Sequence, residues 1–176
     1  MIDSSSSPKP TKPDVRGQYR FKTWISGGKQ YKQAWGWLGM PGQVREFRSS
    51  SAQRGVAGGS GEDAGHLIGN RFGSPGGVEN LSPQNWKANR YGTYKDLEDR
   101  WARERLAGID IFVQVTDVTK SGDVRPFMRN VQWTSSGYGR CLLMISSWGF
   151  TALREFRCRH RFQHRFAAAS EDVEKC

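Results

Sequence analysis

Apolar and polar positions follow two different periods in the second half of the chain. Between residues 93 and 106 apolar side chains recur near helical spacing with charged residues between them, and Gly108 follows as a stop signal. This pattern predicts a helix over 93–106. Residues 109–118 alternate instead, which places four branched residues on one face of a predicted strand: Ile109, Ile111, Val113 and Val115.

A second strand follows after a short turn. Residues 120–123 have the composition of a turn, and Phe127, Val131 and Trp133 mark the next strand, which we expect to be antiparallel to the first. A helix followed by a hairpin indicates an α+β domain in which the helix packs on an antiparallel sheet.

The flanking regions are less regular. Aromatic and basic residues interleave over 19–47, where glycines interrupt any helix, so short strands and turns are expected there. Residues 49–61 are polar and glycine-rich and predict a loop. Residues 1–16 are typical of a disordered leader or linker. We therefore expect one domain over 17–137 and a basic extension of uncertain order over 138–176.

The charge balance narrows the classes of partner. The chain has 27 Lys and Arg against 17 Asp and Glu, a formal net charge of +10, which favours a polyanion such as nucleic acid. No apolar run approaches the roughly 18 residues of a membrane span, so we predict no membrane partner. Its first residues lack the features of a signal peptide, and three cysteines do not suggest a disulfide framework.

The candidate chemistry lies between residues 62 and 101. His66 follows Asp63-Ala64-Gly65, and a nine-residue interval separates Asn80 from Asn89. Together with later motifs, these residues resemble the DNA/RNA non-specific endonucleases of the ββα-metal (His-Me finger) superfamily. More closely, they look like the version found at the C-termini of bacterial secreted polymorphic toxins. The resemblance covers residues 43–137 and includes Asn80-Leu81-x-Pro83-Gln84-Asn85, Gly92-x-Tyr94-Lys95-x-Leu97-Glu98 and Arg125-Pro126.

The resemblance implies a ββα-metal core and a catalytic site. It implies Mg²⁺-dependent, sequence-nonspecific hydrolysis of phosphodiester bonds in DNA, RNA or both, with Mn²⁺ as a substitute ion. His66 would be the general base and Asn89 the metal ligand, while Asn80 would support the metal-binding loop. Glu98 would either orient metal-bound water or form a structural ion pair. It lies more than two helical turns beyond Asn89, so it could not ligate the same ion unless the chain bends.

These residue types suit phosphodiester hydrolysis. An imidazole with a reference pKa of about 6.5 can accept a proton from water near neutral pH. Mg²⁺ prefers oxygen ligands and often needs only one or two protein groups, so a single Asn amide is sufficient. Asp63 would brace the His66 strand by binding backbone amides. Four cations would contact phosphates without reading sequence: Arg71, Lys87, Arg90 and Lys95.

Four features leave alternatives open. Ala64 stands where the family commonly has Arg, and the interval from Asn89 to Glu98 is one residue longer than usual, with Tyr91 as the inserted residue. Trp86 and Tyr91 could stack on unpaired bases or belong to the core. His66 taken alone could be structural. A noncatalytic basic module that binds nucleic acid and an inactive protein-interaction domain are therefore the alternative functions.

The toxin-like resemblance also implies a route of delivery and a protein partner. Without a signal peptide, we expect a secreted effector that is delivered by another route and acts in the cytoplasm of a target cell. An immunity protein would then protect the producing cell.

Overall fold

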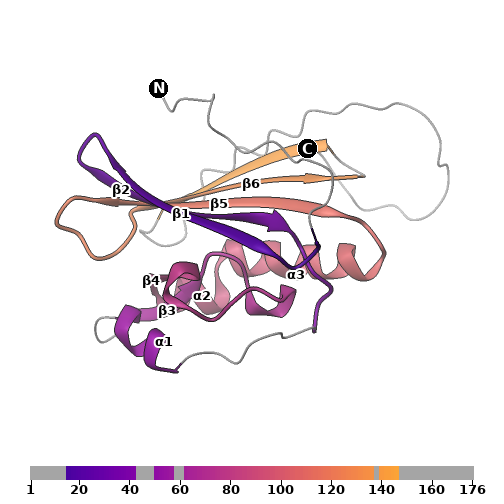
Figure 1. The fold of residues 1–176 in the computed structure, drawn as a ribbon, viewed down its shortest axis with the longest axis horizontal. Helices are drawn as coiled ribbons and strands as arrows, with labels where there is room; N and C mark the ends of the chain where they lie inside the picture. Colours follow the sequence, from indigo (N-terminus) through magenta and orange to yellow (C-terminus); the bar gives the residue numbers. More distant parts are fainter. Residues whose placement is uncertain (1–14, 43–49, 58–61, 137–138, 147–176) are drawn as a thin grey trace.

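The structure is a computed structural model that describes residues 15–42, 50–57, 62–136 and 139–146. It is an α+β fold in which a large antiparallel sheet forms one layer and the helices lie against one of its faces (Figure 1). In chain order the strands and α-helices are β1 (Tyr19–Ser26), β2 (Lys29–Trp37), α1 (Ser50–Ala57), β3 (Glu62–His66), β4 (Leu81–Asn85), α2 (Trp86–Tyr91), α3 (Thr93–Leu106), β5 (Ile111–Lys120), β6 (Met128–Ser135) and β7 (Gly139–Ser146).

The core lies between the large sheet and α3. The strands are in the order β1-β2-β5-β6-β7, and every neighbouring pair is antiparallel. The α3 helix buries Leu97 and Trp101 against this sheet, and the Trp101 ring packs edge-on to Trp133 with centroids 5.8 Å apart. The α+β class, the helix over 93–106 and the antiparallel hairpin after it are confirmed. Burial of these aromatic rings stabilises the contact between α3 and the sheet.

A second, smaller sheet leads into the helices. Strands β3 and β4 pair antiparallel with His66 opposite Leu81, and the chain passes from β4 directly into α2 and then α3. This order of two strands and a helix gives the ββα arrangement that the sequence predicts. Two side chains outside the small sheet bond to its strands. Lys32 Nζ of β2 donates to the Leu81 carbonyl, and Arg125 Nε, from the connection between β5 and β6, lies 2.8 Å from Glu62 Oε1.

Two predicted regions differ from the structure. Residues 50–57 form the α1 helix rather than a loop. Four residues on one side of α1 are partly buried: Ala52, Gln53, Val56 and Ala57. This partial burial explains how a polar, glycine-containing segment is stabilised as a helix. Strand β7 lies beyond the expected domain boundary at 137 and pairs with β6, so the sheet continues into the basic extension. The leader over 1–14 and the rest of the extension over 147–176 lie outside the described residues.

Candidate active site

A pocket of about 620 Å³ opens between β3, α2 and the first part of α3. This volume is within the range of binding sites for small ligands. Its wall includes His66, Asn89 and Glu98, so the three residues assigned to catalysis and metal binding lie together. Asp63, Arg71, Arg90 and Lys95 also line it. Asn80 and Lys87 are not among its lining residues.

The position of His66 is set by the chain on both sides of it. His66 ends β3, opposite Leu81, and the next amide, Leu67 N–H, donates to the Asn80 carbonyl at 2.8 Å. The Tyr94 hydroxyl donates to the Leu67 carbonyl, which joins this turn to α3. The Nε2 atom of the His66 ring is buried. The imidazole is therefore carried by a turn whose backbone is bonded to β4 and to α3.

Asn80 organises the turn after His66 through a fully buried side chain. Its Oδ1 accepts from Ile68 N–H at 3.1 Å. Its Nδ2 lies 2.9 Å from the Ile68 carbonyl, 3.0 Å from Ser74 Oγ and 2.9 Å from the Pro75 carbonyl. The amide thus bonds both the N–H and the carbonyl of Ile68, as a buried amide must if its polar groups are to be satisfied. Asn80 supports the loop that carries His66 rather than touching the pocket.

Asn89 is presented to the pocket by the short helix α2. Asn85 caps this helix, because its Oδ1 accepts from Lys87 N–H at 3.0 Å and from Ala88 N–H at 3.4 Å. Asn89 Nδ2 donates to Asp63 Oδ2 at 3.2 Å. This bond uses the nitrogen end of the amide and leaves the carbonyl oxygen as the end that can face a cation.

Asp63 braces the site through side chains, which differs from the predicted backbone amides. Its carboxylate accepts two bonds from Arg90, from Nε at 2.8 Å and Nη2 at 3.0 Å, besides the bond from Asn89. The Arg90 hydrogen bond is the main cause that lowers the pKa of Asp63, and burial partly opposes it. Asp63 therefore stays ionised at neutral pH and fixes the orientation of the Asn89 amide.

Glu98 reaches the pocket because the helix is interrupted. Gly92 separates α2 from α3, and a Cβ atom there would lie 2.3 Å from the Ala88 carbonyl, so only glycine allows this break. Glu98 Oε1 accepts from Gly69 N–H at 2.8 Å. A Cβ on Gly69 would lie 2.7 Å from the same oxygen. The chain thus bends between Asn89 and Glu98, which is the condition under which the sequence reasoning allowed Glu98 to reach a metal ion held by Asn89.

The environment of Glu98 favours a neutral acid. Burial raises its pKa from 4.5 to about 7, while the Gly69 amide and the charge of Arg129 act in the opposite direction. Within the described part of the chain Glu98 forms no ion pair, so the structural pairing considered for it is not seen there. A bound cation beside this carboxyl would lower its pKa and favour the ionised form.

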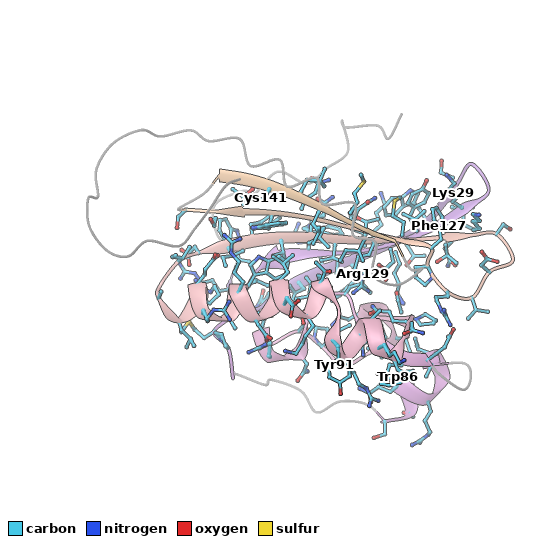
Figure 2. All side chains as sticks on the ribbon, turned by 180° about the vertical axis from the view of Figure 1, so that it is seen from behind. Lys29, Trp86, Tyr91, Phe127, Arg129 and Cys141 are labelled. Carbon is cyan, nitrogen blue, oxygen red and sulfur yellow. The ribbon has the colours of Figure 1, made fainter. Side chains whose placement is uncertain are left out.

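Arg129 is a site residue that the sequence reasoning missed. This buried side chain comes from β6 and forms two bonds to Asp117 of β5, each 2.7 Å long. Its Nη1 also donates to the His66 carbonyl at 3.1 Å, and its guanidinium lies over the Tyr94 ring at 4.7 Å. Figure 2 shows Arg129 between the sheet and the helices. The only sequence signal was its place in the strand after Arg125-Pro126, within the resemblance.

The four predicted phosphate-binding cations are not equivalent. Arg71 and Lys95 both pair with Asp99, and Arg90 pairs with Asp63. Lys87 is exposed and forms no ion pair with any residue that the structure describes. Three of the four charges are thus already shared with a carboxylate, and Lys87 carries a full charge beside the pocket.

The donor atoms of the pocket suit a hydrated cation. The Asn89 carbonyl oxygen and the Glu98 carboxylate are hard oxygen ligands of the kind that Mg²⁺ binds. Over the described ranges no group of three or more His, Cys, Asp or Glu side chains could hold a metal ion. Water and substrate phosphate would have to complete the shell of an ion at this site.

In the part of the chain that the structure describes, no helix combines the length and apolarity of a membrane span.

The comparisons with known proteins agree with this geometry. A solved structure of Sda1 nuclease with bound zinc ion has a similar fold, with a TM-score of 0.59 and 14% sequence identity over 82% of this chain and 79% of that one. No curated protein matches the sequence. The sequence profile of the DNA/RNA non-specific endonucleases matches residues 40–137, more than half of the chain, and includes every residue of the pocket. The chain therefore belongs to the DNA/RNA non-specific endonuclease family and is an endonuclease that hydrolyses nucleic acids.

Proposed function

We propose that the protein is a Mg²⁺-dependent, sequence-nonspecific endonuclease in which His66 is the general base and Asn89 the metal ligand. One observation carries the proposal: His66, Asn89 and Glu98 line a single pocket, although they come from three elements. The net charge of +10 suits a polyanionic substrate of any sequence.

The metal would be held by the Asn89 carbonyl oxygen, with Glu98 orienting water in its shell. The choice of Mg²⁺, with Mn²⁺ as a substitute, follows from the oxygen donors, whereas the solved structure of Sda1 nuclease has zinc. When bound, the ion supplies positive charge that stabilises the phosphate and the leaving oxygen. Asp63 accepts from the nitrogen of the Asn89 amide, which would leave the carbonyl oxygen to hold the ion.

His66 would accept the proton of the attacking water. A neutral imidazole can accept this proton near pH 7. Hydrogen bonds to the His66 carbonyl and from the Leu67 N–H fix the backbone that carries the ring. Arg90, Arg71, Lys95 and Lys87 would contact the phosphates on either side of the scissile bond. Such contacts hold the backbone of DNA or RNA without reading bases.

Plasmid DNA and a structured RNA, incubated with Mg²⁺ or with EDTA, test the activity. We expect both substrates to be cut only in Mg²⁺. His66→Ala should reduce the rate at least about 100-fold, the contribution of a general base, and leave binding within a few-fold. His164→Ala, which removes a histidine outside the segment matched by the family, is the control. Survival of both the plasmid and the RNA in Mg²⁺ would leave a noncatalytic binding module instead.

The metal ligand has its own test. Asn89→Ala removes the carbonyl oxygen, so the Mg²⁺ concentration for half-maximal rate should rise at least about tenfold. Asn85→Ala weakens the cap of the same helix without removing a ligand, and serves as the control. An Asn89→Ala enzyme with the metal titration of the unaltered protein would remove Asn89 from this role.

The toxin-like sequence further supports a biological setting. We infer that the protein is a secreted effector that acts in a target-cell cytoplasm and is held inactive in the producer by an immunity protein. Expression in a bacterial cytoplasm should then stop growth and degrade nucleic acid, while His66→Ala should not. Normal growth of cells that contain active enzyme would contradict this setting.

A further inference from the structure

Two large aromatic side chains of α2 are exposed beside the pocket. Tyr91 is 72% exposed and Trp86 37% exposed. Their rings pack edge to face, with centroids 6.5 Å apart and an interplanar angle of 77°. Figure 2 shows both on the side of the helices that faces away from the sheet. These two residues are therefore not part of the core, which was one of the two roles that the sequence left open for them. The other role is stacking on unpaired bases.

The aromatic pair is continuous with the pocket. Asn89 and Arg90 lie between Trp86 and Tyr91 on the same six-residue helix, and both line the pocket. Two cations also lie over the Trp86 ring: Lys87 Nζ is 5.5 Å and the Arg90 guanidinium 5.9 Å from its centroid. An apolar ring surface and positive charge thus occur together on the helix that carries Asn89 and Arg90 of the pocket wall. A nucleotide, with its flat base and its phosphate, has both complementary features.

Only an unpaired base can use such a surface. Within a duplex both faces of each base are covered by the neighbouring base pairs, so a protein ring cannot stack on them unless the base leaves the helix. A single strand exposes its bases at little cost, and stacking on an aromatic ring is indifferent to which base it is. The stacking surface is therefore compatible with nonspecific cleavage and distinguishes single strands from duplexes.

We propose that Tyr91, held edge to face by Trp86, stacks on a base of single-stranded DNA or RNA beside the pocket, so that the enzyme prefers single-stranded substrate. This inference rests on the proposed nuclease function for its setting. Lys87 and Arg90 contact the adjoining phosphates. Binding of the base is a property of the exposed rings and does not depend on which residue is the general base.

Binding in the absence of turnover is the primary test. The His66→Ala full-length chain in EDTA is titrated against three labelled probes by fluorescence anisotropy: a single-stranded oligonucleotide, the same sequence as a duplex, and a single strand of equal length with abasic sites. Tyr91→Ala should weaken binding of the intact single strand about tenfold, the size of one lost stacking contact. Duplex and abasic affinities should change less than twofold.

Substitutions at the same position separate stacking from bulk. Tyr91→Phe keeps the ring and should bind as tightly as the tyrosine form, whereas Tyr91→Leu keeps apolar bulk and should resemble Tyr91→Ala. Leu106→Ala removes another exposed apolar side chain, 66% exposed at the end of α3, and is the matched control. Thermal unfolding of each variant verifies that α2 and the fold are retained.

Turnover by the otherwise unaltered enzyme gives a second readout. Tyr91→Ala should lower kcat/KM for the single strand about tenfold and leave kcat/KM for the duplex within about twofold. Equal losses on single strands and duplexes, an equal loss on the abasic strand, or no loss at all would each overturn the proposal. If His66→Ala proves fully active, the proposed base is wrong, but the binding experiment in EDTA still decides the role of Tyr91.

Discussion

Replacing Arg129 by Met should lower the free energy of unfolding and also reduce the rate of catalysis. The Arg129 guanidinium is 7% exposed and its partner Asp117 is 2% exposed, so this substitution leaves a carboxylate buried without its counter-ion. It also removes the donor to the His66 carbonyl. The two effects can be separated, because only the first is repaired when Asp117 is replaced too.

The magnitude follows from the burial of the pair. Breaking a buried ion pair by removing one partner costs about 3–5 kcal/mol, and a domain is stable by only about 5–15 kcal/mol. Asp117→Leu/Arg129→Met replaces both charges with apolar groups, and its free energy of unfolding should return to within about 1–2 kcal/mol of the unaltered protein. Its activity should stay at least about tenfold low, since the Arg129 donor to the His66 carbonyl is still missing.

The assay combines urea unfolding with initial rates of plasmid cleavage. The midpoint of unfolding should fall for Arg129→Met with an unchanged slope, which shows a loss of stability rather than a change of folded state. Arg129→Lys keeps the charge, but one ammonium cannot reproduce a bidentate guanidinium that also bonds a carbonyl, so it should be intermediate in both measurements.

Two results would refute this reasoning. An Arg129→Met protein within about 1 kcal/mol of the unaltered protein would show that the buried pair contributes little. A double variant with full activity would show that Arg129 acts only on stability and that His66 does not need its carbonyl held.

Two further predictions concern buried groups of the site. Asn80→Ala leaves the Ile68 N–H without its acceptor in the core and should lower the free energy of unfolding by about 2–4 kcal/mol in urea; a loss below 1 kcal/mol would contradict the role of its amide. The raised pKa of Glu98, about 7, means that the folded protein binds more protons than the unfolded chain between pH 4.5 and 7. The stability of the unaltered protein in EDTA should therefore fall through this window by about 1–3 kcal/mol relative to Glu98→Gln; a difference that is constant between pH 5 and 8 would be inconsistent with burial of this carboxyl.

Local sequence was sufficient for the elements that the core depends on. The helix over 93–106 and the hairpin after it were predicted because their apolar residues repeat with a clear period, and Leu97, Trp101 and Val113 are buried as that period requires. The period did not predict that Leu106 is exposed or that β5 is buried on both faces. The α1 helix was missed because its composition favours a loop. Its helical form depends on partial burial of one side of the helix, which its local sequence does not predict.

The chain order of the motif likewise determined part of the site. Asp63 and His66 lie on β3 and Asn89 lies on α2, within the small ββα unit, so short-range folding brings them together. The break at Gly92, which brings Glu98 to the same pocket, could not be foreseen from the spacing, because a glycine inside a helical pattern is often tolerated.

By itself, the sequence determined the family and the main helix and hairpin, and it indicated the residues that we propose to act on a phosphodiester. Tertiary structure alone decided that Arg129 bonds a carbonyl 63 positions away and that Trp86 and Tyr91 face solvent. The physical reason is that sequence patterns report which side of an element is apolar. They do not report which distant element comes to cover a charge or leave a ring exposed, because that depends on how separate layers pack.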